Sequence, residues 1–242
     1  MKKQIPFFLL CCSFVSCTYT MDNCNAQLMK EHKEQLLKAI KEDRNIETIR
    51  NLLNIGIKPD EVIDKNGLTP LIHAVQNRRD DIVKELLAIG ANPNTTFHVR
   101  GISPLSIAVF LDSEKIVKIL LDYKADTNVY DDEGNTPLII STEYPCNETI
   151  VQMLLDSKAN PNAHNLRGFT PLLLTTNHEF DDQEKCLKQV AIVSMLLNAG
   201  ANPNEDTGWG TPLSFTMQSS SIAGEPMANL LLHAIKNPRK DI

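Results

Sequence analysis

The sequence predicts an all-α protein, a solenoid of stacked helix pairs that are joined by β-turn fingers. Two sets of landmarks recur in one register. The first is a Thr/Ser-Pro-Leu tripeptide, whose prolines stand at positions 70, 104, 137, 171 and 212, with spacings of 34, 33, 34 and 41 residues. The second is a Leu-Leu pair, at positions 52–53, 86–87, 120–121, 154–155 and 196–197. Such a period indicates one small structural unit that is repeated and stacked on itself.

The first helix of each unit is expected to begin at the Thr/Ser-Pro-Leu tripeptide. A Thr or Ser hydroxyl can accept a hydrogen bond from a free backbone N–H at the start of a helix. Proline fits the next position, because the N–H that it lacks has no partner there. A glycine lies just before each tripeptide, at positions 67, 101, 134, 168 and 210, where it permits the tight turn of a finger.

The second helix of each unit contains the Leu-Leu pair. In unit two, Ile82, Val83, Leu86 and Leu87 form an apolar stripe at helical spacing. Glycines at positions 56, 90 and 200 follow this helix in three units and can adopt the left-handed conformation that often ends a helix. Lys124 and Lys158 occupy the same place in units three and four, where we expect some backbone strain.

The pattern resembles the ankyrin repeat, a unit of about 33 residues with a finger and two antiparallel helices. The segments Gly-Leu-Thr-Pro-Leu-Ile-His-Ala at 67–74 and Asp-Ile-Val-Lys-Glu-Leu-Leu-Ala-Ile-Gly-Ala-Asn-Pro-Asn at 81–94 carry the resemblance. It covers residues 33–237 in six units, of which the first and last are irregular. The approximate units are 33–64, 65–94, 95–128, 129–162, 163–204 and 205–237, followed by a tail at 238–242.

Unit five departs from the period by an insertion of nine residues at 177–185. An extended helix turn is the favoured interpretation, because solenoids accommodate insertions in loops. The segment also carries an acidic cluster with a His and a Cys, which leaves a metal or catalytic site as an alternative. Its members are His178, Glu179, Asp181, Asp182, Glu184 and Cys186. Their spacing matches no helix-borne metal motif, so a solvated acidic loop is favoured.

Composition argues against several other functions. The net charge of −6, with eight Phe, four Tyr and one Trp, offers little to a nucleic acid. We expect no cofactor and no metal, because the sequence contains neither a phosphate-binding loop nor a zinc motif. His73 is interpreted as a packed or hydrogen-bonded histidine, and Cys146 and Cys186 as thiols in preference to a disulfide.

The N-terminus predicts an export signal at residues 1–20. Lys2 and Lys3 precede an uncharged stretch at 5–16 that is too short to span a bilayer but suits the apolar region of a secretory signal. Ser16-Cys17 resembles a lipoprotein cleavage site, which makes Cys17 a candidate for lipidation. Ordinary cleavage nearby and a buried N-terminal helix are the alternatives, and residues 21–32 are expected to form a linker.

The resemblance implies a non-enzymatic, monomeric module that binds a protein on the concave face made by the fingers and first helices. If a host is involved, such an exported protein would engage host proteins. A membrane-anchored envelope lipoprotein that binds or inhibits a periplasmic neighbour is the alternative, and an enzyme using the 177–186 segment is a remote one. The predicted partner-binding residues are Asp64, Lys65, Asn66, His98, Val99, Arg100, Asp131, Asp132, Glu133, Asn165, Leu166, Arg167, Thr207 and Trp209. Their alternating charges favour a specific protein epitope, and Trp209 is interpreted equally as a partner contact or a packing residue.

Overall fold

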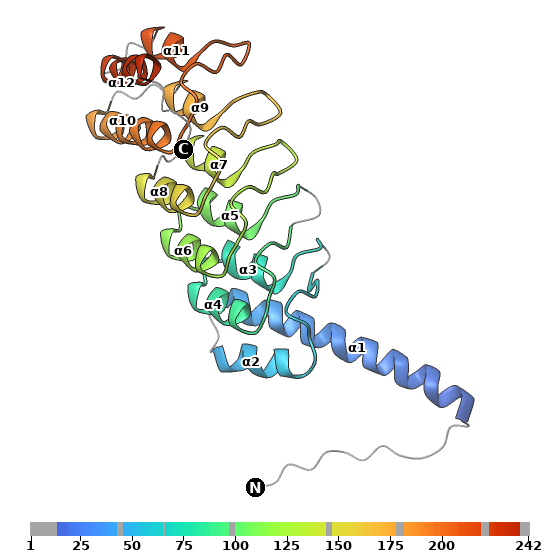
Figure 1. The fold of residues 1–242 in the computed structure, drawn as a ribbon. Coiled ribbons are helices and arrows are strands. Elements are labelled where there is room, and N and C mark those ends of the chain that lie inside the picture. The colour runs from blue at the N-terminus through green and yellow to red at the C-terminus, as the bar shows by residue number, and fades with distance from the viewer. Residues whose placement is uncertain are drawn as a thin grey trace.

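The fold is an elongated stack of helix pairs, seen in a computed structural model (Figure 1). The structure describes residues 14–42, 46–64, 66–96, 100–143, 147–177, 182–218 and 223–237, with side chains of the first helix described from residue 25. These residues form twelve helices and no strand. The helices are α1 (Phe14–Lys41), α2 (Ile46–Asn54), α3 (Pro70–Gln76), α4 (Asp80–Ala88), α5 (Pro104–Phe110), α6 (Glu114–Asp122), α7 (Pro137–Glu143), α8 (Glu148–Asp156), α9 (Pro171–Asn177), α10 (Gln183–Asn198), α11 (Pro212–Gln218) and α12 (Gly224–Lys236).

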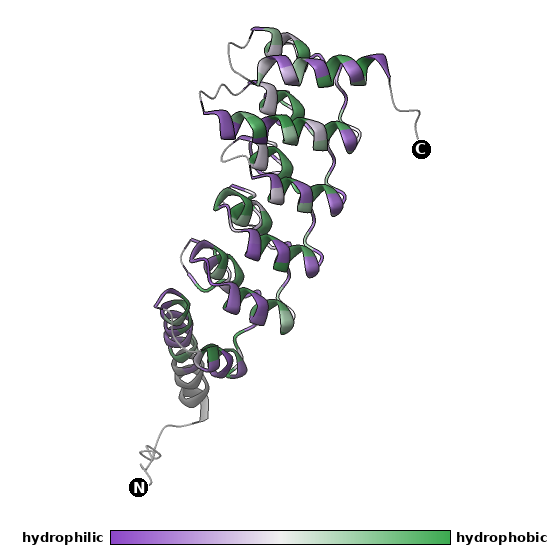
Figure 2. Cartoon of the chain, turned by 90° about the vertical axis from the view of Figure 1, so that its left-hand side faces the viewer, coloured by the Kyte–Doolittle hydropathy of each residue, from purple (hydrophilic) through white to green (hydrophobic). Residues whose placement is uncertain are grey.

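The helices lie in two layers. The odd-numbered helices from α3 to α11 stack on one another beside the fingers, and the even-numbered helices form the second layer (Figure 1). Hydrophilic and hydrophobic stretches alternate along the helices, which is typical of burial on one side only (Figure 2). The predicted all-α solenoid with fingers is therefore confirmed.

The first helices begin where the sequence predicts. The helices α3, α5, α7, α9 and α11 all start at the proline of a Thr/Ser-Pro-Leu tripeptide. The Thr69 hydroxyl accepts a hydrogen bond from the Ile72 N–H at 3.4 Å, and Ser103 accepts one from the Ser106 N–H at 3.1 Å. The hydroxyl thus satisfies a donor that the helix leaves without a partner.

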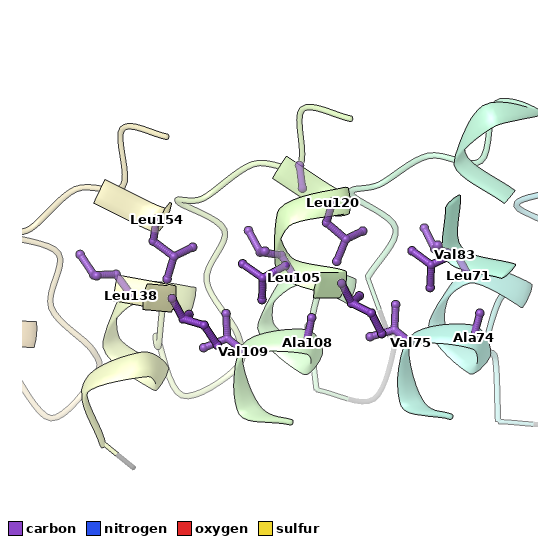
Figure 3. Packing of buried hydrophobic residues seen from close by; sticks show 14 of the residues in the cluster. Leu71, Ala74, Val75, Val83, Leu105, Ala108, Val109, Leu120, Leu138 and Leu154 are labelled. Atoms are coloured by element: carbon purple, nitrogen blue, oxygen red, sulfur yellow. The ribbon is translucent and has the colours of Figure 1, made fainter. Parts of the chain in front are cut away.

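The core runs continuously through the stack. Leu71, Leu105 and Leu138 from the first helices and Leu120 and Leu154 from the second are all fully buried. Figure 3 shows Leu105 facing Leu120 and Leu138 facing Leu154 within their units, with Val75 and Val109 of the first helices directed toward the next unit. Each unit therefore buries its apolar side chains only when its neighbours are present.

The turns after the second helices are joined by a ladder of side-chain hydrogen bonds. The last residue of each turn accepts a hydrogen bond from the backbone N–H that opens the next turn. The pairs are Asp60 with Asn92 at 2.7 Å, Asn94 with Asp126 at 2.8 Å, Asn128 with Asn160 at 2.8 Å and Asn162 with Asn202 at 2.7 Å. This ladder explains why the repeated turn needs a short carboxylate or amide side chain at its last position.

Two segments differ in local structure from what the sequence suggests. Residues 21–32, expected to form a linker, belong to the continuous helix α1. The segment 177–185 is also partly helical, because α10 starts at Gln183 and has 16 residues, whereas α8 has nine. The Asp182 carboxylate accepts a hydrogen bond from the Glu184 N–H at 2.8 Å and so caps the longer helix, which buries Cys186 and Gln189. Residues 178–181 lie outside the described residues.

Within the described ranges, no helix combines the length and the apolar character needed to cross a membrane.

The ends of the second helices show the expected strain. Gly90 and Gly200 have φ angles of 95° and 94°, in the left-handed region that glycine adopts readily. Lys124 and Lys158 have φ angles of 64° and 69° at the corresponding positions. A left-handed conformation costs about 1–2 kcal/mol for a residue with a Cβ atom.

Replacing Lys124 by glycine is therefore expected to stabilise the protein. Glycine relieves the backbone strain of the left-handed position but also adds conformational entropy to the unfolded chain. The net increase in the free energy of unfolding should be about 0.5–1 kcal/mol. Urea unfolding followed by circular dichroism measures it. The control is Lys118→Gly, in the interior of α6, which we expect to lower the free energy of unfolding by about 1 kcal/mol. If both variants lowered the free energy of unfolding equally, the backbone strain assigned to Lys124 would be contradicted.

Candidate functional site

Backbone hydrogen bonds join neighbouring fingers. The Asp132 N–H donates to the Arg100 carbonyl at 3.1 Å, and the Leu166 N–H donates to the Glu133 carbonyl at 2.9 Å. The Asn165 side-chain amide also donates to the Asn135 side-chain oxygen at 3.0 Å. The backbones of the fingers of units three, four and five are thus held to one another. A Cβ atom on Gly134 would lie only 2.8 Å from the Leu166 nitrogen.

Three of the predicted partner-binding residues shape the fingers from inside. The Asp131 carboxylate accepts hydrogen bonds from the backbone N–H groups of Glu133 and Asn135, at 2.9 and 2.7 Å. Asp64 and Asn165 make the same pair of bonds within their own fingers. The structure therefore gives these three side chains a role in the turn itself.

His73 lies beside the first of these fingers. Its Nε2 atom lies 3.0 Å from a carboxylate oxygen of Asp64, and the ring is buried. Burial lowers the pKa of His73, and the attraction of Asp64 opposes that effect. The interpretation of His73 as a packed, hydrogen-bonded histidine is confirmed.

The exposed residues at the finger tips are those whose side chains project from the turns. Among the predicted residues these are Asn66, Arg100, Asp132, Glu133, Leu166, Arg167 and Trp209. Lys65, His98 and Val99 lie outside the described residues. The fingers project along one side of the stack, next to the first helices (Figure 1). The exposed tips and the first helices therefore share one continuous surface, which we call the finger face.

A groove of about 630 Å³ lies in the finger face, between the fingers of units three and four and the helices α3, α5 and α7. Its apolar part consists of Ile102, Ile107, Phe110, Leu111 and Ile140. The Phe110 side chain is 71% exposed although it is a large apolar ring. A volume of this size accommodates a few side chains of a bound molecule.

The polar part of the groove is predominantly acidic. Asp131, Asp132, Glu133 and Glu143 line it, and Arg100 is the one basic residue among its described lining. Glu143 is an exposed residue, but partial desolvation of its carboxyl in the groove raises its pKa. Arg167 opposes this effect, and the nearby carboxylates of Glu133 and Asp131 add to it. The groove therefore combines exposed apolar surface with negative charge that its own residues do not neutralise.

Sequence reasoning missed the helical residues of this groove. Gln76, Phe110 and Glu143 stand six residues after the landmark prolines of three successive units. The other two tripeptide units have Asn177 and Gln218 at that position. A phenylalanine at a position that is otherwise polar was the available signal.

A second, smaller hollow of about 110 Å³ lies farther along the finger face. It is lined by Phe169, Trp209 and Phe215 together with residues of α9. The rings of Phe169 and Trp209 have centroids 6.2 Å apart, at an interplanar angle of 54°. Trp209 is nevertheless 71% exposed, so it packs on its neighbour along one side and stays accessible on the other.

Half of the candidate metal or catalytic cluster falls outside the described residues. His178, Glu179 and Asp181 are among the residues that the structure leaves out, and Cys186 is buried on α10. In the part of the chain that is described, no three His, Cys, Asp or Glu side chains are grouped so that they could hold a metal ion.

Stacked helix pairs with projecting fingers define an ankyrin-type solenoid, and the comparisons agree. The family model described as ankyrin repeats (3 copies) matches residues 8–97 and 89–165, so the chain belongs to the ankyrin repeat family. An ankyrin repeat domain from Acinetobacter baumannii AYE is similar in structure, with a TM-score of 0.72 and 27% sequence identity. The similarity covers 83% of this chain and 97% of that domain. No curated protein sequence matches the chain.

Family membership indicates the general class of function. Ankyrin repeats are generally protein-interaction modules, and the family is typically non-enzymatic. The exposed finger tips and the two hollows lie on the finger face. This is the face on which the resemblance to the ankyrin repeat leads us to expect a partner.

The raised pKa of Glu143 predicts a small gain in stability for Glu143→Gln. The ordinary pKa of a glutamate is 4.5, so folding carries a penalty once the pH rises through the higher value of the folded state. Removing the charge should increase the free energy of unfolding at pH 7 by up to about 0.5 kcal/mol, as is typical of surface changes.

Chemical denaturation at pH 7 and at pH 4 tests this prediction. The gain should be present at pH 7 and absent at pH 4, where Glu143 is largely protonated in both states. Glu34→Gln, on the exposed side of α1 and outside the groove, controls for the loss of one surface charge. A loss of stability at pH 7 would contradict the cause assigned to the shift.

Proposed function

We propose that this protein is a non-enzymatic, monomeric interaction module that holds a protein partner on its concave finger face. The groove beside Phe110 carries the proposal. A large apolar ring that stays in water at a position occupied by polar residues in other units contributes little to folding. Burial of that ring by a partner would contribute about 1.5–3 kcal/mol to binding.

The scaffold supplies the rigidity that such binding needs. Because backbone hydrogen bonds hold neighbouring fingers together, the positions of Arg100, Asp132 and Glu133 are set before a partner arrives. Ordering of flexible segments costs free energy on association, and a preformed surface avoids part of that cost. The exposed tip side chains are then free to determine which partner fits.

Trp209 is proposed as a second anchor on the same face. Tryptophan is enriched among the residues that dominate binding energy, and this ring stands beside an apolar hollow. A partner that covers both Phe110 and Trp209 would extend over the fingers of units three to six, which suits an elongated or helical binding segment.

Partner capture is expected to depend on these two rings and not on the opposite layer. Phe110→Ala and Trp209→Ala should each weaken capture about tenfold or more, with little change in melting temperature because both rings are largely exposed. Affinity capture from the native organism followed by calorimetry with the captured partner measures the effect.

Leu187→Ala is the matched control, because Leu187 is an exposed apolar residue of α10 in the second layer. This variant should capture the partner with the same affinity as the original protein. A partner that binds all these variants equally would contradict a binding site on the finger face. Equal losses of binding and thermal stability would assign the rings to the fold instead.

We also propose that the chain is exported, as a secreted host-interaction factor or as a membrane-anchored lipoprotein that binds or inhibits a neighbouring envelope protein. The proposal is supported by Lys2, Lys3 and the uncharged stretch at 5–16. Ser16-Cys17 favours the anchored form, in which Cys17 is lipidated and then becomes the mature N-terminus. Cleavage there would remove the first residues of α1 and leave its contacts with α2 and α3 in place.

Cys17→Ala distinguishes the two forms of export. If Cys17 is lipidated, the variant should lose incorporation of a labelled fatty acid and leave the membrane fraction. Cys186→Ala, which changes a buried thiol in the repeats, is the control and should keep both properties. Membrane association that persists in Cys17→Ala would contradict the anchor, and intact N-terminal Met1 in the mature protein would contradict cleavage.

A further inference from the structure

We propose that the groove beside Phe110 binds a partner segment in which an arginine side chain stands next to an apolar one. This inference rests on the proposed function and specifies the chemistry of its partner. It follows from the way in which apolar and acidic groups are placed relative to each other in the groove.

The two kinds of group occupy the same register position in neighbouring units. Phe110 ends α5 and Glu143 ends α7, each six residues after its landmark proline. Because α5 packs directly against α7, the apolar ring and the carboxylate lie on adjacent helices of one groove. A bound segment therefore meets an apolar contact and an acidic contact one repeat apart.

The acidic residues of the groove outnumber the cations that act on them: four carboxylates line it, against Arg100 in the lining and Arg167, whose charge acts on Glu143. In the described part of the chain, the side chains of Asp132, Glu133 and Glu143 form no hydrogen bond or salt bridge, whereas Asp131 is engaged by its own turn. Arg100 is the only cation among the described residues that line the groove. The charge that a partner meets is therefore negative, which favours a cationic side chain and disfavours an acidic one.

A guanidinium group suits this site better than a metal ion does. No set of described residues is grouped for metal binding, and the three available carboxylates belong to two different elements, a finger and the end of α7. Guanidinium is planar, pairs with carboxylates through two parallel hydrogen bonds and stacks on aromatic rings. Phe110 and Glu143 line the same groove, so a partner segment can pair an arginine with Glu143 and place its apolar or stacking contact at Phe110.

An arginine paired with the carboxylates would leave part of the apolar surface of the groove uncovered. Ile102, Ile107 and Ile140 line the same groove and are only partly buried. A neighbouring aliphatic or aromatic side chain of the partner would cover them. The volume of about 630 Å³ holds these two side chains and not an extended domain surface.

The test is a selection from a random library of 12-residue peptides displayed on phage, using the full chain as target. Clones that bind the original protein are counter-selected on Phe110→Ala, and their sequences are compared with the unselected library. We expect enrichment of arginine next to Leu, Ile or Phe. Synthetic peptides from these clones should bind about tenfold more weakly to Glu143→Gln and more weakly still to Glu143→Lys.

Matched controls separate charge from fold. Glu34→Gln should bind the peptides as the original protein does, and replacing the peptide arginine by glutamine should cause a loss similar to that of Glu143→Gln. The two changes together should cost less than the sum of the separate losses, because they remove the same contact.

Four outcomes would overturn the inference. Peptides that depend on Phe110 but show no preference for arginine, or that bind Glu143→Gln with full affinity, would contradict it while leaving the proposed function intact. Failure to select any peptide that depends on Phe110 would contradict both. Self-association in sedimentation experiments that Phe110→Ala abolishes would identify a second copy of the chain as the occupant.

Discussion

The whole structure depends on burial that is shared between neighbouring units. A pair of helices of seven and nine residues is too small to enclose its own apolar side chains, so Leu71, Leu105 and Leu138 become fully buried only in the stack. The Asp/Asn ladder joins the turns on the same principle, because each acceptor belongs to one unit and each donor to the next. Stability and shape are therefore properties of the array, and any surface that spans several units inherits its rigidity.

The finger face is the functional consequence of that arrangement. Backbone groups at the tips are used in holding neighbouring fingers together, whereas most of the side chains there are left exposed. The side chains can consequently change from one unit to the next without loss of the fold. Phe110, Glu143 and Trp209 are examples, since each contributes little to the core and each stands in or beside a hollow.

The groove also carries a small energetic cost. Glu143 keeps a charge near Asp131 and Glu133, and desolvation together with these neighbours raises its pKa. The charge therefore lowers the free energy of unfolding slightly at neutral pH. The exposed ring of Phe110 likewise contributes little to folding. Both features are consistent with a surface suited to a partner, because proteins commonly give up some stability at their binding sites.

The sequence by itself determined the period, the starts of the first helices, the strained lysines and the class of fold, because those features are local: a capping hydroxyl, a proline or a left-handed residue acts within one turn of the chain. It did not reveal that α1 is continuous through residues 21–32 or that the insertion lengthens α10. Only the tertiary structure decided that Asp64, Asp131 and Asn165 face into their own turns, and that Phe110 and Glu143, 33 residues apart, line one groove. The physical reason is that a groove arises from packing between units, which no single unit encodes.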